Sequence, residues 1–588
     1  MKNRFFPIIL LIAAMMAPAF AAAYDFEYGG IYYDITGDNT VSVTYKDTNL
    51  HSYSGTVNIP ATVTHGGVQY NVTAIGRNAF RQSQNLTSVT IPNGVQTIGY
   101  ASFYKCTGMT SISIPNSVTF IDYFAFRDCS SLISIILPNS VTTLSSQVFQ
   151  NCTALKNVTL PNGITFIGAG LFMGCSSLES IIIPGSVTEI DMYAFSDCTS
   201  LTDITFSDAT YYISSDAFDN TPWLENLPDG VLYAGKVAFS FKGIMEENCH
   251  LTLKPGTISI GARAFYGLDA LAGITIPSSV YYIGRSCLAN CYNLETIVVE
   301  NGNTTFDSRN NCNAIIETAT NKLYIGCKST VIPTSVTGID DYAFYECEGL
   351  YNVNLHEGIT YIGENAFFGC HFLSGITIPA TVNTIGSKAF AECFRMTSMK
   401  VANGNSTYDS RNNCNAIIET ATNRLIAGCV NSYIPNGITT IGEWAFYGHY
   451  FIQFMRIPAS VTSIENYAFN DLSHLTEIVC EAVTPPACTG TSFFYISLEN
   501  GILYVPRTSI EAYQNDQWWG RFVDIRAIED LLIGDVDNNG NVNITDVIKL
   551  INMLLGGQMQ YKYLADMNHD GTITITDAIM LINAISNN

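Results

Sequence analysis

Two twelve-residue stretches near the C-terminus place oxygen-bearing side chains in the same order. DVDNNGNVNITD spans Asp535 to Asp546, and DMNHDGTITITD spans Asp566 to Asp577, thirty-one residues further on. In both, these side chains stand at positions 1, 3, 5, 9 and 12, and the first has Gly540 at position 6. A hard divalent cation binds six to eight oxygens, and glycine at position 6 allows the sharp turn of a calcium loop. The spacing therefore predicts two calcium ions.

The pattern assigns a ligand type to each position. In the first loop the side-chain ligands are Asp535, Asp537, Asn539 and Asp546, with Asn541 binding through its carbonyl and Asn543 through a water. In the second they are Asp566, Asn568, Asp570 and Asp577, with Thr572 binding through its carbonyl and Thr574 through a water. A helical apolar stripe follows each loop: Val547, Leu550, Ile551 and Leu554, then Ala578, Leu581, Ile582 and Ile585.

The residues before these loops repeat with a period of 23. Phenylalanines recur at that spacing at Phe80, Phe103, Phe126, Phe149, Phe172, Phe195 and Phe218. Cysteines do the same at Cys106, Cys129, Cys152, Cys175 and Cys198, and again at Cys347, Cys370 and Cys393. A fixed period in this range is the signature of a solenoid. Each coil has too small a core to fold alone, and stacking completes it.

The repeating unit is C-x-x-L-x-x-I-x-I-P-x-x-V-x-x-I-x-x-x-A-F. Its I-x-I segment has period two, which predicts a strand with one buried face, and the proline ends that strand. A second short strand carries Val118 and Ile121 in one coil, and the Ala-Phe pair is expected in a turn. Outward positions of the first strand are small and polar: Ser88, Thr90, Ser111, Ser113, Asn157, Thr159, Asp203 and Thr205. Such a surface lacks the aromatic anchors of tight binding.

Two near-copies interrupt the period, at Asn301 to Cys327 and at Asn403 to Cys429. Each is expected to form a hairpin-like insertion. Its DSRNN motif indicates either a binding loop or, as we favour, a polar turn held by hydrogen bonds between aspartate and arginine.

The composition and charge of the chain limit the kinds of molecule that it could bind. The chain has 588 residues, a formal charge of −23 and only 13% charged residues, and it lacks a basic cluster that could bind nucleic acid. Lys2 and Arg4, the apolar run from Ile8 to Met16 and Ala19-Phe20-Ala21 predict a signal peptide over residues 1–21 rather than a buried strand. No other segment is long and apolar enough for a membrane span. We therefore expect a secreted protein.

The seventeen cysteines could form disulfides in an exported chain. Cysteines one coil apart would lie within disulfide range, but their Cβ vectors would run parallel, which favours a ladder of buried thiols. The better disulfide candidates are Cys312 with Cys327, Cys414 with Cys429 and Cys480 with Cys488. The sequence has no HExxH, GxSxG or phosphate-binding loop, so we expect no catalysis.

The 23-residue unit resembles the BspA-like leucine-rich repeat of bacterial surface proteins. The resemblance implies a right-handed solenoid, mostly β with short helical turns, over residues 74–478 with insertions at 301–327 and 403–429. It also implies a strand-rich cap over 24–73 and a C-terminal cap over 479–528. BspA-like proteins are associated with adhesion, so the expected ligand is a host matrix or plasma protein or a microbial surface macromolecule.

The paired loops and helices resemble a type I dockerin, over residues 529–588, because both loops end in aspartate and both are followed by a helix. The resemblance implies a small α-helical module that attaches to a cohesin on a scaffold or cell surface. It assigns the cohesin contacts to loop positions 10 and 11, which are Ile544 and Thr545, then Ile575 and Thr576. Their near-identity implies binding in two orientations.

Two functions are compatible with this organisation. The first is a secreted, non-catalytic adhesion or interaction protein whose array binds an extracellular macromolecule. The second is an accessory subunit of a polysaccharide-degrading, cellulosome-like complex. The scarcity of exposed aromatic residues that could stack on sugars favours the first.

Overall fold

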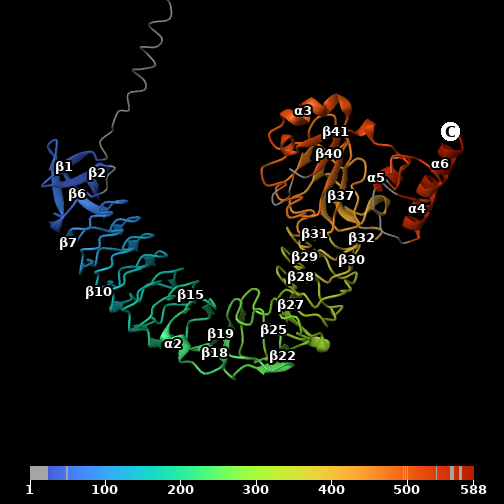
Figure 1. Ribbon diagram of the computed structural model, residues 1–588. Helices are drawn as coiled ribbons and strands as arrows, with labels where there is room; N and C mark the ends of the chain where they lie inside the picture. Colours follow the sequence, from blue (N-terminus) through green and yellow to red (C-terminus); the bar gives the residue numbers. More distant parts are fainter. Residues whose placement is uncertain are drawn as a thin grey trace, which may run out of the picture. The chain divides into compact units, whose positions relative to one another are not determined.

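The computed structural model describes residues 24–47, 51–493, 496, 498, 501–537, 539–555, 562–568 and 573–587 (Figure 1). The predicted signal peptide, 1–21, lies outside them. The chain divides into two compact units, which are described separately. Unit 1 runs to Gly243 and includes Thr257–Ala264 and Tyr282–Gly284, and unit 2 contains the rest. Among the described residues, no helix has both the length and the apolar character needed to cross a bilayer.

Unit 1 confirms the predicted stack of coils, in which each coil contributes two short parallel strands. The I-x-I strands are β7 (Leu86–Thr90), β10 (Ser134–Ile136), β12 (Asn157–Thr159), β14 (Ser180–Ile182) and β16 (Asp203–Thr205). The second strands are β8 (Thr97–Ile98), β9 (Phe120–Ile121), β11 (Thr143–Leu144), β13 (Phe166–Ile167), β15 (Glu189–Ile190) and β17 (Tyr212–Ile213). Ile181 pairs with Ile204 and Ile190 with Ile213, so the register advances by one repeat.

The N-terminal strands continue the ladders of the coils. They are β1 (Phe26–Tyr28), β2 (Ile31–Gly37), β3 (Thr40–Thr44), β4 (Gly55–Asn58), β5 (Thr62–His65) and β6 (Val68–Ile75). The strands β1, β2 and β3 form an antiparallel meander, β6 joins β3 in parallel, and β8 of the coils then pairs with β6. The edge that the first coil would otherwise expose is therefore paired.

A column of phenylalanine rings runs through the core of unit 1. Successive rings from Phe80 to Phe218 are parallel within 14°, with centroids 4.9–5.6 Å apart. This separation is close to the ~4.8 Å spacing of neighbouring strands. The backbone of the same turns is also paired, because Phe103 N–H donates to Ala125 O at 2.8 Å. Each ring therefore packs between its counterparts in the coils above and below.

The cysteines form the predicted ladder of buried thiols, and the structure shows what each thiol does. Cys129 Sγ donates to Phe103 O at 3.0 Å, and Cys152 Sγ donates to Phe126 O at 3.1 Å. The same contact recurs from Cys106, Cys175, Cys198, Cys291, Cys370 and Cys393. A thiol is small enough for this site and adds a second hydrogen bond to a carbonyl that already accepts from a backbone N–H, as Phe103 O does from Cys106 N–H at 3.1 Å. Burial raises the pKa of Cys129 to about 12, so this thiol stays protonated at neutral pH.

The three disulfide candidates are wrong in this structure, where all seventeen cysteines are free thiols. The four cysteines of the two hairpin insertions each contact a backbone carbonyl, Cys414 and Cys429 as Cys312 and Cys327 do. Cys312 Sγ donates to Ala314 O and Cys327 Sγ to Asn313 O, while Cys480 Sγ contacts Tyr513 Oη at 3.1 Å.

His449 replaces cysteine in one rung of unit 2. It follows Phe446 as Cys347 follows Phe344, is 1% exposed and has no hydrogen-bond partner at Nδ1. Burial lowers its pKa to about 4. The unfolded chain has the ordinary histidine pKa of about 6.5 and binds the proton first as the pH falls.

We therefore expect His449 to make the stability of unit 2 pH-dependent. The free energy of unfolding is unaffected by protonation of this histidine above pH ~6.5. It falls by roughly 3 kcal/mol as the pH drops towards 4. His449→Leu, which copies Leu472 of the next coil, should remove this part of the pH dependence. Urea unfolding of both proteins near pH 7 and near pH 4.5 measures it, and equal pH dependence would refute the assignment.

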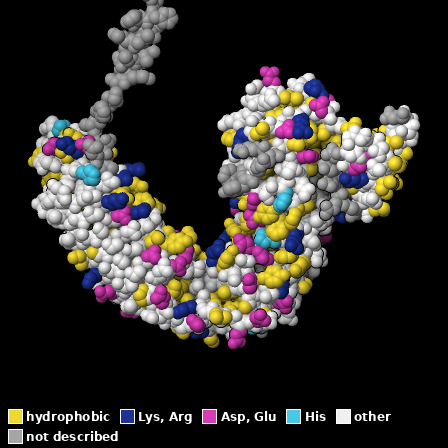
Figure 2. Space-filling view, in the orientation of Figure 1, with side chains coloured by type: hydrophobic (Ala, Val, Ile, Leu, Met, Phe, Trp, Pro, Cys, Tyr) yellow, Lys and Arg dark blue, Asp and Glu magenta, His cyan; other side chains and the backbone are white. Residues whose placement is uncertain are grey.

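Unit 2 repeats the two-ladder architecture. Its I-x-I strands are β20 (Cys249–Thr252), β22 (Leu271–Ile276), β24 (Thr296–Val299), β30 (Gly375–Ile378), β32 (Ser398–Val401), β37 (Phe454–Ile457) and β39 (Glu477–Cys480). Its second strands are β28 (Gly338–Ile339), β29 (Tyr361–Ile362), β31 (Thr384–Ile385), β36 (Thr440–Ile441) and β38 (Ser463–Ile464). In the view of Figure 2, hydrophobic side chains are sparse over β7 to β10 and dense over β28 to β37.

Both predicted insertions are antiparallel hairpins that join the second ladder. The first consists of β25 (Phe306–Asp307), β26 (Ala314–Glu317) and β27 (Lys322–Gly326), and the second of β33 (Tyr408–Asp409), β34 (Ala416–Glu419) and β35 (Arg424–Gly428). The last strand of each pairs in parallel with the next coil, β27 with β28 and β35 with β36. A hairpin therefore takes the place of one coil in the ladder.

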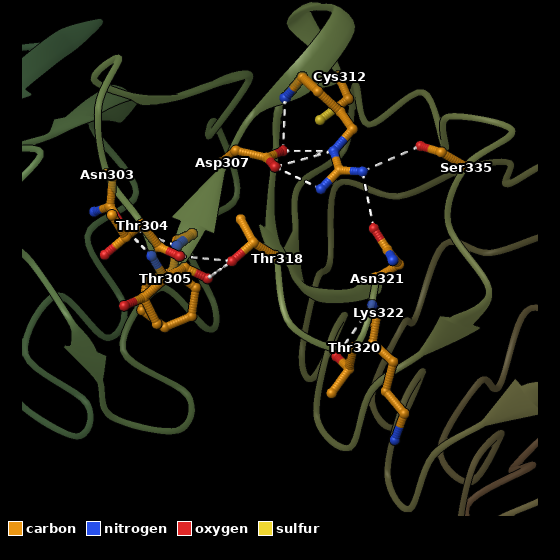
Figure 3. A network of polar contacts seen from close by, with 12 residues as sticks. Asn303, Thr304, Thr305, Asp307, Cys312, Thr318, Thr320, Asn321, Lys322 and Ser335 are labelled. Atoms are coloured by element: carbon orange, nitrogen blue, oxygen red, sulfur yellow. Dashed lines mark hydrogen bonds and ion pairs between the residues drawn. The ribbon is translucent and has the colours of Figure 1, made fainter.

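The DSRNN motif is the polar turn that the sequence favoured (Figure 3). Arg309 Nε donates to Asp307 Oδ1 at 2.8 Å, and Arg309 Nη1 donates to Asn321 Oδ1 at 2.9 Å. In the second copy, Arg411 contacts Asp409 and Asn423 in the same way. The arginine thus connects the turn to the hairpin through two planar contacts.

A third interruption was not predicted. After Phe218 the chain forms the short helix α2 (Pro222–Glu225) and the hairpin β18 (Gly230–Ala234) with β19 (Val237–Lys242). The strand β19 pairs with β21 (Ser259–Ile260), which pairs with β23 (Tyr282–Ile283). The segment with α2, β18 and β19 is not repeated elsewhere in the sequence, so periodicity alone does not reveal it.

The last coil is closed by β40 (Ile502–Val505), β41 (Asp524–Ala527) and helix α3 (Ile510–Asn515). The strands β39, β40 and β41 pair in parallel. Trp519 and Tyr513 are fully buried, and their polar atoms donate to Pro486 O and Ala482 O. This segment covers the open end of the core, as expected of a cap.

Candidate metal centre

The two calcium-loop sequences lead directly into helices α4 (Ile544–Leu554) and α6 (Ile575–Ser586). Position 9 of each loop, Asn543 or Thr574, is the N-cap, and its side chain accepts a hydrogen bond from the first turn. Position 12, Asp546 or Asp577, completes a capping box by accepting from the N-cap backbone N–H. The same aspartate thus begins the helix and points a carboxylate into the loop.

Three carboxylates meet in the first loop. Ligand oxygens of Asp535, Asp537 and Asp546 lie within 4.8 Å of one another, and Asp535 and Asp546 are 2% and 0% exposed. Oxygens bound to one calcium at 2.3–2.6 Å can be up to about 5 Å apart, so this set fits a single ion. Buried carboxylates without a cation repel one another, which makes a cation the natural complement of the cluster.

The loop backbone is shaped by these carboxylates. Asp535 Oδ1 accepts from Asn539 N–H at 2.9 Å, and Asp535 Oδ2 accepts from Gly540 N–H at 2.7 Å. Gly540 has φ +84°, the left-handed conformation in which glycine is unstrained. The predicted turn at position 6 is therefore present. Asn541 lies on the exposed side, and its N–H donates to Asn539 Oδ1 at 2.9 Å.

The second loop is described only in part. Asp566 and Asp577 are 3% and 0% exposed, and Asp577 accepts from Met567 N–H and Thr574 N–H at 2.9 and 2.8 Å. Asn568 is exposed, whereas Asp570 and Thr572 lie outside the described residues. The buried carboxylates at positions 1 and 12 match those of the first loop.

The helices share a small core with helix α5 (Lys562–Ala565). It contains Val536, Val547, Leu550, Met553, Ala565, Ala578 and Leu581. Leu554 and Ile585 pack at its edge. The predicted stripe was too wide, because Ile551 and Ile582 are 41% and 43% exposed rather than buried. Two short helices offer too little surface to cover an apolar sector that broad.

The exposed apolar residues form two matching lines. Ile544, Ile548 and Ile551 on α4 correspond to Ile575, Ile579 and Ile582 on α6, thirty-one residues later, and all six are exposed. Ile544 and Ile575 are 61% and 71% exposed. Thr545 Oγ1 donates to Asp537 Oδ2 at 3.1 Å, which ties loop position 11 to position 3. Ile548 and Ile579 were not singled out from the sequence, although the spacing of four residues was visible there.

Comparisons with known proteins agree with this architecture. The family described as BspA type leucine rich repeat region matches residues 62–177, 119–246, 226–322, 317–427 and 424–513, and the dockerin type I domain matches residues 533–586. No curated protein matches the chain.

Several solved structures are similar. A leucine-rich repeat protein from Bacteroides ovatus is 22% identical over 74% of this chain and 95% of that chain, with a TM-score of 0.32. A leucine rich repeat protein from T. pallidum is 27% identical over 32% and 85%, with a TM-score of 0.29. A leucine rich cell surface protein from Faecalibacterium prausnitzii is 24% identical over 77% and 94%, with a TM-score of 0.26.

The repeating coils and the paired loop–helix units thus each have a counterpart. The chain belongs to the BspA type leucine-rich repeat family and carries a dockerin type I domain over residues 533–586.

Proposed function

We propose that this is a secreted, cell-surface-associated interaction protein without catalytic activity. Its repeat array binds an extracellular macromolecule, a host matrix or plasma protein or a molecule of a microbial surface. Its dockerin domain attaches the array to a cohesin-bearing partner in a calcium-dependent manner. The observation that carries this proposal is the pair of matching exposed lines beside the carboxylate cluster of the first loop and the buried Asp566 and Asp577 of the second.

Two calcium ions would be held by the loops. Asp535, Asp537, Asn539 and Asp546 would bind the first through side chains, with Asn541 by its carbonyl and Asn543 through water. Asp566, Asn568, Asp570, Asp577, Thr572 and Thr574 would do the same for the second. The ions supply the positive charge that lets the carboxylates approach one another, and the chain supplies the caps that start both helices.

The cohesin-facing surface would centre on Ile544 and Thr545, and on Ile575 and Thr576. Because the two pairs occupy equivalent positions, either helix could occupy the same groove of a partner. Exposed isoleucines beside a hydroxyl make an apolar centre with a polar edge, which is the common composition of a protein interface.

The array would bind through its outward strand positions and turns. The small polar positions predicted there are indeed exposed on β12 and β16, but Ile136 and Ile182 are also 71% and 72% exposed. The alternative function, an accessory subunit of a polysaccharide-degrading complex, is favoured by exposed aromatic residues of unit 2, such as Tyr351 and Phe451.

Variants of the two isoleucines test the attachment. We expect the full chain to bind at least one of a panel of recombinant type I cohesins in calcium and none in chelator. Ile544→Asp or Ile575→Asp alone should weaken binding only about twofold, because one of two equivalent orientations remains. The double variant should lose at least about 30-fold, the size of a hot-spot loss. Biolayer interferometry measures all three.

Ile182→Asp is the matched control, an equally exposed isoleucine on the array that should leave cohesin binding unchanged. Binding that persists in chelator, or a double variant that binds as well as the parent, would contradict the proposed attachment.

A further inference from the structure

The turn that follows each ladder cysteine differs between the two units. In unit 1 the first residue of this turn is Thr107, Ser130, Thr153, Ser176 or Thr199. These hydroxyls bond from coil to coil, as when Ser176 Oγ donates to Thr153 O at 3.3 Å. In unit 2 four of these turns carry rings, Tyr292, His371 and Phe372, Phe394, and Tyr450 and Phe451 after His449. The turn after Cys347 carries Glu348 and Gly349, and the ring of that coil, Tyr351, comes after Leu350.

Several aromatic residues of unit 2 form two groups of ring contacts, which meet at the sequence neighbours His371 and Phe372. Tyr292 and Tyr351 both contact Phe372, with ring centroids 6.2 and 5.4 Å apart. His371 lies 4.6 Å from Phe394, which in turn lies 5.3 Å from Tyr450 and 6.1 Å from Phe451. We call Tyr292, Tyr351, Phe372, Phe394 and Phe451 the aromatic row. It follows the stacking direction, with a ring or ring pair in each coil.

The coil does not need these rings in order to fold. Five coils of unit 1 close the same turn with serine, threonine, glycine or alanine, and their leucine and cysteine anchors are equally buried. Tyr351 and Phe451 are 51% and 53% exposed. Tyr292, Phe372 and Phe394 are half-buried. A partly exposed aromatic surface that the fold does not require indicates an interaction site.

Charges of both signs lie along the row, and two pairs of them are in contact. Lys328 Nζ, which lies over the ring of Tyr292, is 3.0 Å from Glu295 Oε1, and His371 Nδ1 is 3.0 Å from Glu348 Oε1. The guanidinium of Arg395 lies over Phe372 at 4.5 Å from its centroid. Neither sign of charge dominates, so the surface complements an uncharged ligand better than a polyanion or a cationic peptide.

We propose that the aromatic row binds an uncharged polysaccharide chain. The faces of sugar rings present C–H groups that pack on the negative faces of aromatic rings. Hydroxyl groups at the edges of the sugars would meet exposed polar side chains beside the row, such as Asn352 and Ser374. A linear polymer of similar units matches a platform that repeats once per coil. This inference rests on the proposal that the array is a binding surface, and it names the ligand class.

Affinity electrophoresis of the full secreted chain tests the row. The gels contain hydroxyethyl cellulose, xylan, galactomannan or a soluble β-1,3-glucan, and dextran sulfate serves as the polyanion arm. We expect at least one neutral polysaccharide to retard the protein. The triple variant Phe372→Ser, Phe394→Thr and Phe451→Ser, which copies the turns of unit 1, should bind that polysaccharide at least about tenfold more weakly.

The fold of the triple variant should be intact, because the same residues stand at these positions in unit 1; its melting temperature checks this. Tyr123→Ser, at an aromatic residue of unit 1 that is 49% exposed, is the control and should bind normally. Retardation by none of the neutral polysaccharides, by dextran sulfate alone, or equally of parent and triple variant would overturn the inference.

Binding of the parent chain and the triple variant to a panel of matrix proteins and to poly-lysine is measured as well. It separates a failure of the polysaccharide inference from a failure of the proposed function of the array. If an extracellular protein binds the array and the triple variant does not affect it, the array is a binding surface but the row is not its glycan site. If that protein loses affinity in the triple variant, the row is a protein-docking site and the polysaccharide inference is wrong.

Discussion

Asp546→Ala abolishes calcium binding by the first loop and unfolds the dockerin domain around it. The carboxylate is fully buried, belongs to the cluster with Asp535 and Asp537, and accepts from Asp537 N–H and Asn543 N–H at 3.0 and 2.8 Å. Its loss removes a ligand and the reciprocal half of a helix cap, the latter costing about 1 kcal/mol. The larger effect follows because metal-binding energy in such a small domain is folding energy.

Calorimetric titration of the full chain measures this effect. We expect two calcium ions for the parent and at most one for Asp546→Ala. Asn541→Ala is the matched control, because that position would bind calcium through its backbone carbonyl and its side chain is exposed. If Asp546→Ala still binds two ions, or Asn541→Ala loses one, the assignment of ligands in the first loop is wrong.

Phe172→Ala destabilises unit 1 by about 3–5 kcal/mol, the usual cost of truncating a fully buried phenylalanine. The ring lies between Phe149 and Phe195, at 5.5 and 5.4 Å, so its loss leaves a cavity open to two coils. In a solenoid the contacts to both neighbours are also weakened, which spreads the effect along the stack. A ring at the end of the column should cost less.

Urea titration of the full chain, read by hydrogen–deuterium exchange in peptides from residues 106–218, reports unit 1 separately. Ile182→Ala provides the comparison, because this side chain is 72% exposed and its truncation should change stability by less than about 0.5 kcal/mol. Similar losses for the two variants would show that the ring column does not hold the coils together.

The period of 23 predicted most of the coil architecture, because each anchor repeats in a position where only one face can be buried. Ile181, Phe172 and Cys175 are buried as the pattern requires. The dockerin loops were equally readable, since ligand spacing and the cap residues lie within one short stretch. Short sequence patterns predict the structure wherever each residue contacts the same position of the neighbouring repeat.

The aromatic row was not predicted, and the reason is the register across the hairpins. Phe394 contacts Phe451 although 57 residues separate them, because the second insertion lies between their coils. Tyr292 and Tyr351 are separated by the first insertion in the same way. A search at a constant period therefore finds isolated rings, and only the stacked coils bring them side by side.

The exposure of Ile551 and Ile582 was missed for a different reason. Helical periodicity identifies the apolar face of a helix. It does not show how much of that face is buried against neighbouring helices. In this domain the short helix α5 and the loop residue Val536 fill the space between α4 and α6. The remaining apolar positions stay at the surface, where a binding partner could cover them.

We expect calcium to organise the dockerin domain and the repeat array to keep its structure without the metal. Hydrogen–deuterium exchange of the full chain, with calcium and with chelator, tests it most directly. We predict that removing calcium speeds exchange throughout peptides from residues 535–586 and leaves the array, residues 86–480, unchanged. Unaltered exchange in the dockerin peptides, or loss of protection in the coils as well, would contradict it.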